Sequence, residues 1–119
     1  NFQKFPEDAA FMISDRIAIR SAVDFVNHAE IIARSAKGVI NSDVSQRLME
    51  VKAKTMIVFG DNDRMIPNRF VHPALSPEEM IQIFKANIRN VSLKIYPDCG
   101  HFVQFEFPEQ FNNDFFHFI

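Results

Sequence analysis

Two loops in this sequence carry residues that could act together as an acid and a base. Asp63 lies in a loop directly after the apolar run 55–59, and His101 lies in a loop directly after the run 91–96. An Asp carboxylate that accepts the Nδ1 proton of a His fixes the tautomer of the imidazole and stabilises the imidazolium form. The pair therefore fits the acid and base of a catalytic triad.

The nucleophile of such a triad is missing from the chain. The 119 residues contain no Gly-x-Ser-x-Gly, nor any other Gly-flanked Ser, Asp or Cys on a strand-to-helix turn. Such a strained turn requires Gly neighbours, which none of the Ser residues has. We expect the nucleophile, whether Ser, Asp or Cys, to lie outside this chain or not to exist.

Other residues compete for these roles. Asp61 is an alternative acid, although it could instead form the turn. His28, His72 and His117 do not follow a strand-like run, and we interpret them as structural or solvent-facing. The sequence shows no spacing typical of metal ligands, so we expect no metal and no cofactor.

Composition narrows the class of protein. The net charge is −2 with interspersed charges, which argues against binding to nucleic acid or to an anionic membrane. The single Cys99 cannot form an internal disulfide, and no apolar run approaches the length of a membrane-spanning helix. We therefore expect a soluble, cytoplasmic protein.

Residues 1–50 have a helical pattern. Residues 7–37 lack Pro and Gly and place apolar residues at three- and four-residue spacings, which predicts two helices with a bend near Asn27–His28 and a stop at Gly38. Ser42–Asp43 resembles the cap of a short helix through Met49, on which Leu48 and Met49 would face inward. We expect this helical segment, 1–50, to be distinct from residues 51–119.

Residues 51–119 read as strand, helix, strand, helix. The run 55–59 is apolar on both faces, as in a buried parallel strand, whereas 91–96 alternates like an edge strand. Between them, Ser76 predicts a capped helix that runs to about residue 87, and Pro108 begins a last helix that runs to residue 118. A right-handed crossover would make the two strands parallel and bring Asp63 and His101 to the same edge of the sheet.

Two motifs resemble the α/β-hydrolase superfamily. The acid-loop pattern Gly-x-x-Asp-x-x-x-Pro matches 60–67, with the acid at Asp63, and the segment 93–112 is similar to the last strand, the catalytic His loop at His101 and the last helix. Cys99-Gly-His-x-x-Gln-x-Glu106 is similar to the meta-cleavage-product hydrolases, which cut carbon–carbon bonds in ring-fission dienoates. Those enzymes generally have Trp at the position of Phe102, and haloalkane dehalogenases and epoxide hydrolases have similar loops.

The resemblance implies a fold and a function. The chain would hold the C-terminal part of an α/β-hydrolase fold, two parallel strands with flanking helices, preceded by helical cap segments in residues 1–50. It would be the acid–base half of an enzyme that hydrolyses an ester-like or carbon–carbon bond in an apolar small molecule. We expect Met65, Ile66 and Phe102 to contact that substrate.

A two-stranded parallel sheet would leave an apolar strand edge open. We expect the chain to pack against a missing N-terminal half or to self-associate through that edge, and the isolated chain to be inactive. The alternative is a non-catalytic, truncated hydrolase remnant that serves as a binding or oligomerising module.

Overall fold

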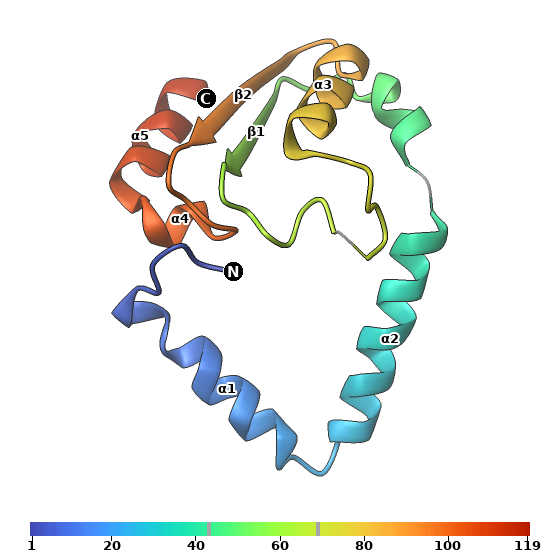
Figure 1. The fold of residues 1–119 in the computed structure, drawn as a ribbon, viewed down its shortest axis with the longest axis vertical. Coiled ribbons are helices and arrows are strands. Elements are labelled where there is room, and N and C mark those ends of the chain that lie inside the picture. The colour runs from blue at the N-terminus through green and yellow to red at the C-terminus, as the bar shows by residue number, and fades with distance from the viewer. Residues whose placement is uncertain (43, 69) are drawn as a thin grey trace. The chain divides into compact units, whose positions relative to one another are not determined.

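The structure is a computed structural model that describes residues 1–42, 44–68 and 70–119 (Figure 1). It consists of two compact units: residues 7–44 form the smaller, and residues 1–6 together with 45–119 form the larger. The division therefore differs from the expected one at residue 50, because residues 1–6 and 45–50 belong to the unit that contains the strands.

The smaller unit is helical. It contains a 3₁₀ helix, Glu7–Ala9, and the helices α1, Phe11–Arg20, and α2, Phe25–Asn41. The predicted bend near Asn27–His28 is wrong, because α1 ends where the N–H of Ser21 bonds to carbonyls of its last turn and α2 begins at Phe25. The predicted stop at Gly38 is also wrong. A glycine in a helix interior costs only about 1 kcal/mol, so α2 continues through it.

A 3₁₀ helix, Ser45–Glu50, leads toward the first strand. Asp43, part of the predicted cap, lies outside the described residues. Leu48 is partly buried as predicted, but Met49 is 69% exposed, which corrects the expectation that both face inward. Neighbouring side chains of a 3₁₀ helix point about a third of a turn apart, so one of the two must face away.

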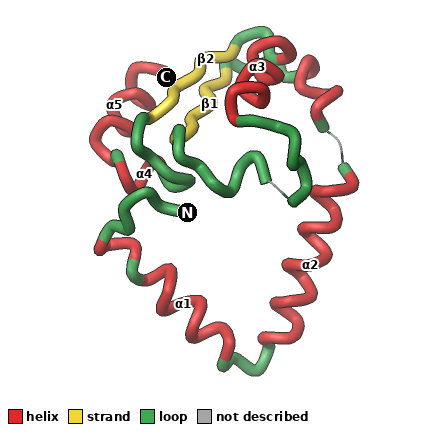
Figure 2. Tube along the Cα trace, viewed as in Figure 1, coloured by secondary structure: helices red, strands yellow, loops and turns green. Residues whose placement is uncertain are grey.

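The larger unit is built on two parallel strands, β1, Thr55–Gly60, and β2, Val91–Tyr96 (Figure 2). Helix α3, Pro77–Asn87, connects them, as predicted. The register pairs the first residues of the strands with each other and the last residues, Gly60 and Tyr96, with each other. Both loops that follow the strands therefore begin at the same level of the sheet.

Side chains alternate along the strands, so the two faces of the sheet pack against different helices. Val58 and Tyr96 point to one face, where they form a core with Cys99, Val103, Phe107 and Phe111. Phe59 points to the other face and stacks on Phe84 of α3, with ring centroids 6.3 Å apart. The two helices that follow β2 are α4, Val103–Glu106, and α5, Pro108–Phe118.

A polar contact attaches α5 to β2. The hydroxyl of Tyr96, a residue that is 1% exposed, donates to Asp114 Oδ2 at 2.6 Å, and Lys94 Nζ lies 2.7 Å from Asp114 Oδ1. The hydrogen bond from Lys94, followed by that from Tyr96, lowers the pKa of Asp114. The carboxylate is therefore held in its charged form between two donors from one strand.

The start of α3 follows the predicted capping box. Ser76 Oγ accepts from the N–H of Glu79 at 3.1 Å, and the Glu79 carboxylate accepts from the N–H of Ser76 at 2.8 Å. Because α3 connects the strands, the cap helps to fix the crossover.

We predict that Ser76→Ala lowers the free energy of unfolding by about 1 kcal/mol, since it leaves the N–H of Glu79 without its acceptor. Urea unfolding monitored by circular dichroism measures the change. Ser35→Ala, at an exposed position inside α2, is the control and should change stability much less. An equal effect of both substitutions would contradict the role of the cap.

Candidate functional site: an acid–base pair at the sheet edge

The loops after β1 and β2 are joined by backbone hydrogen bonds. The N–H of Asp61 donates to the carbonyl of Tyr96 at 3.0 Å, and the N–H of Asn62 donates to the carbonyl of Cys99 at 2.9 Å. The Asp61 carboxylate also accepts from the N–H of Cys99 at 3.3 Å. The two loops therefore leave the sheet as one connected layer.

Gly60 makes this close approach possible. A Cβ placed on Gly60 would collide with the carbonyl oxygens of Cys99 and Gly100, which are backbone atoms and cannot move aside like a side chain. The glycine of the acid-loop motif is thus explained by the contact of its backbone with the His loop.

Asp63 and His101 meet at this edge. His101 Nδ1 lies 2.8 Å from Asp63 Oδ2, and the side chains are 25% and 5% exposed, respectively. Because a carboxylate can only accept, the ring donates its Nδ1 proton and Nε2 becomes the basic nitrogen. Among the residues that the structure describes, Nε2 has no hydrogen-bond partner, so it is available to take a proton.

The second oxygen of Asp63 is also occupied. Asp63 Oδ1 accepts from the N–H of Met65 at 2.7 Å and from that of Ile66 at 3.2 Å. The carboxylate is therefore oriented by its own loop, independently of His101, and presents Oδ2 to the ring. This arrangement fixes the direction of the hydrogen bond that the imidazole makes.

The structure distinguishes the two candidate acids. Asp61 uses Oδ1 to accept from the N–H of Cys99 and from the side-chain amide of Asn62, so it braces the turn. The carboxylate that His101 contacts is that of Asp63. Of the other histidines, His117 bonds to the carbonyl of Asn113 within α5, and His72 follows the acid loop and lies apart from the pair.

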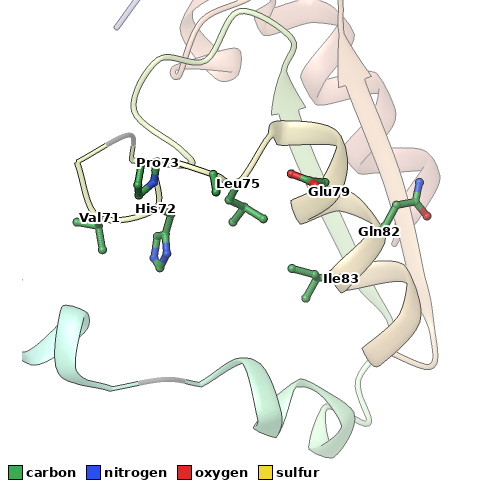
Figure 3. A pocket seen from close by; sticks show the side chains of 8 residues that line it. Val71, His72, Pro73, Leu75, Glu79, Gln82 and Ile83 are labelled. Carbon is green, nitrogen blue, oxygen red and sulfur yellow. The ribbon is translucent and has the colours of Figure 1, made fainter.

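The apolar residues expected to contact substrate lie next to the pair. Met65 and Ile66 are 38% and 41% exposed, and Phe102 packs edge-on against His101 with ring centroids 5.0 Å apart. A separate hollow of about 610 Å³ lies between residues 71–75 and α3 (Figure 3). Its lining includes neither Asp63 nor His101, so it is not the space that faces their chemistry.

Glu106 also belongs to the site. It is the last residue of the motif that begins at Cys99, but its sequence context predicted no role for it. Its Oε1 accepts from the N–H of Gly100 at 2.8 Å and lies 3.8 Å from Cys99 Sγ. Burial, followed by the charge of Glu106, raises the pKa of the Cys99 thiol to about 12. Cys99 is thus a neutral packing residue rather than a nucleophile.

Within the described ranges, no three His, Cys, Asp or Glu side chains gather as a metal site. None of the helices described there is both long and apolar enough to cross a membrane.

Comparison with known proteins relates the chain to hydrolases. The chain is 36% identical over 70 residues to 2-hydroxy-6-oxo-6-phenylhexa-2,4-dienoate hydrolase of Burkholderia cepacia, a match that covers 59% of this chain and 21% of the relative. It is 36% identical over 77 residues to 2-hydroxy-6-oxononadienedioate/2-hydroxy-6-oxononatrienedioate hydrolase of Escherichia coli, covering 65% of this chain and 23% of that protein. No family model matches the chain.

A solved structure gives the same relationship in three dimensions. The serine hydrolase CarC, involved in carbazole degradation, matches 62% of this chain and 25% of its own, with a TM-score of 0.51 and 27% identity. The chain resembles the α/β-hydrolase superfamily. Its parallel strands and flanking helices form part of an α/β-hydrolase fold, and the chain spans about a fifth to a quarter of the length of these relatives.

The raised pKa of Cys99 predicts sensitivity to alkali. An unfolded thiol ionises near its ordinary pKa of 9.0, whereas the folded one stays protonated to about 12. Between these values the unfolded state releases its proton first, so the free energy of unfolding should fall as pH rises. Urea unfolding from pH 8 to pH 11 measures this slope. Cys99→Ser should make the slope shallower without removing it, because burial also raises the pKa of the Tyr96 hydroxyl, and an unchanged slope in that variant would contradict the assignment.

Proposed function

We propose that Asp63 and His101 are the acid and base of an α/β-hydrolase active site. The contact between His101 Nδ1 and Asp63 Oδ2 carries the proposal, because it is the hydrogen bond that sets a histidine up as a general base. The similarity to several hydrolases supports the same reaction class.

In the proposed reaction, the nucleophile comes from outside residues 1–119. As it attacks the substrate, Nε2 of His101 takes its proton and later delivers that proton to the leaving group. Asp63 remains ionised, keeps the ring oriented and stabilises the imidazolium that forms. Backbone N–H groups that hold the oxyanion would also come from the complementary portion of the fold.

The substrate class is part of the proposal. The names of the Burkholderia and Escherichia relatives describe hydrolases of 2-hydroxy-6-oxo acids with conjugated double bonds. We propose a carbon–carbon or ester-like bond in an apolar small molecule, with Met65, Ile66 and Phe102 beside the reacting group. We also propose that the helices of residues 7–44 belong to a cap segment, a role that their helical structure and their place before β1 in the sequence support.

A chimera tests the proposed roles. Residues 1–119 would replace the stretch of the Burkholderia hydrolase that includes the 70 matched residues, and hydrolysis of the dienoate in that enzyme's name would be measured. We expect an active chimera whose turnover falls by about 10⁴ in Asp63→Asn and at least as far in His101→Ala. His117→Ala, on the exposed part of α5, is the control and should retain activity.

Two results would contradict the proposal: a folded chimera with no activity, or one that keeps its turnover after His101→Ala.

The nucleophile is identified by a separate experiment. A fluorophosphonate probe should label a serine enzyme that contains this segment, whereas labelling of residues 1–119 alone should fail.

We propose as a second function a non-catalytic module derived from a hydrolase, and the edge of β1 that is unpaired among the described strands is the observation that favours it. Among the described strands, β1 pairs with β2 alone, and β1 carries the apolar residues Met56 to Phe59. We propose that the other edge of β1 pairs with a further part of the fold or with a second copy of the chain.

Sedimentation of residues 1–119 shows whether the chain associates with itself or stays a monomer. We predict dimers or larger assemblies because an apolar parallel strand with one unpaired edge tends to add another strand. Lys substituted for Ile57 should weaken the assembly, whereas Lys substituted for exposed Ser92 on β2 should not. A stable monomer with a cooperative unfolding transition would argue against an incomplete sheet.

A further inference from the structure

The first six residues of the chain lie on the His101 loop, although about 100 positions separate them in sequence. We call residues 1–6 the N-terminal strap. The carbonyl of Asn1 accepts from the N–H of His101 at 2.6 Å. The ring of Phe2 stacks on Phe102, with centroids 4.8 Å apart, and meets Phe105 edge-on at 6.3 Å. The strap therefore contacts the backbone of His101 and the ring of the following residue.

Glu106 joins the strap to the loop. Its Oε2 accepts from the N–H of Gln3 at 2.9 Å and from that of Lys4 at 3.3 Å. Its Oε1 accepts from the N–H of Gly100. One carboxylate thus receives charge-assisted hydrogen bonds from two segments that share no secondary structure, and such bonds are stronger than neutral ones.

Gly100 shows how tightly these parts fit. A Cβ at this position would collide with the carbonyl oxygen of Asn1 and come within 2.8 Å of Glu106 Oε1. The backbone on the N-terminal side of His101 is held by Glu106, and the N–H of His101 itself is held by Asn1. Both attachments are within one residue of the imidazole that bonds to Asp63.

We infer that Glu106 is a positioning residue that, together with the N-terminal strap, holds the His101 loop where the imidazole meets Asp63. Its consequence for turnover depends on the proposed hydrolase function, whereas its effect on the geometry of the loop does not. Displacing a catalytic group by about 1 Å can lower a rate by about 10². The contacts of Glu106 and the N-terminal strap with the His101 loop, which we call the clamp, would therefore affect the reaction directly.

Glu106→Gln tests the inference. The amide keeps the size of the side chain, but it removes the charge and turns an NH₂ donor toward one of the two sets of N–H donors. In isotopically labelled residues 1–119, we expect hydrogen exchange at Gly100 and Gln3 to become at least about tenfold faster. We also expect the ¹⁵N resonance of His101 Nδ1 to move toward the value of a free histidine.

Glu109→Gln makes the same chemical change on the exposed first turn of α5 and should leave both signals in place. If Glu106→Gln does not fold, Phe2→Ala tests the same clamp without touching the carboxylate, with Phe116→Ala, at a position that is 70% exposed, as its control. It too should speed exchange at Gln3 and shift His101 Nδ1.

An unchanged His101 Nδ1 resonance in a folded Glu106→Gln or Phe2→Ala variant would overturn the positioning role, even if stability fell. This outcome is separate from failure of the hydrolase proposal. An inactive chimera would contradict the hydrolase proposal. The hydrogen-exchange and imidazole measurements would still show whether Glu106 positions the His101 loop. Conversely, an unchanged His101 Nδ1 resonance together with an active chimera would contradict the positioning role of Glu106 and leave the hydrolase proposal intact.

Discussion

The parallel pairing of β1 with β2 is the constraint on which the site depends. The register aligns Gly60 with Tyr96, so the two following loops leave the sheet side by side. Hydrogen bonds from Asp61 and Asn62 to the backbone of the second loop then keep them in contact. The acid and the base are 38 positions apart in sequence, yet each needs only a short, braced loop to reach the other.

The elements that sequence analysis predicted well have strong local signals. The two strands, the capping box at Ser76 and the last helix from Pro108 each follow from residues within a few positions of one another. The contact between Asp63 and His101 followed because parallel strands place both loops at one edge.

The features that were missed depend on distant parts of the chain or on weak local preferences. Nothing near Glu106 indicates that its carboxylate binds the N–H groups of Gln3 and Lys4, because that contact exists only after the chain folds. Gly38 lies inside α2 because the cost of a helical glycine is small compared with continuing the helix. The position of the break after α1 likewise had no Pro or Gly to mark it.

The site divides its tasks among residues in a way that suits an acid–base role. Asp61 braces the turn, Asp63 orients the imidazole, and Cys99 stays protonated in the core. The N-terminal strap and Glu106 then act on the backbone of the His loop. These roles belong to one end of a two-stranded sheet, which is why the proposed enzyme needs a further portion of the fold to supply the nucleophile.

The most direct test is the protonation pattern of the His101 ring in the unmodified chain. ¹⁵N chemical shifts of the imidazole distinguish the tautomers, and a low-field proton on Nδ1 reports its hydrogen bond to a carboxylate. We predict that the hydrogen bond to Asp63 holds a proton on Nδ1, so that this tautomer of the imidazole dominates over the one with its proton on Nε2 alone. A ring with its proton on Nε2, or one that exchanges freely between both tautomers, would contradict it.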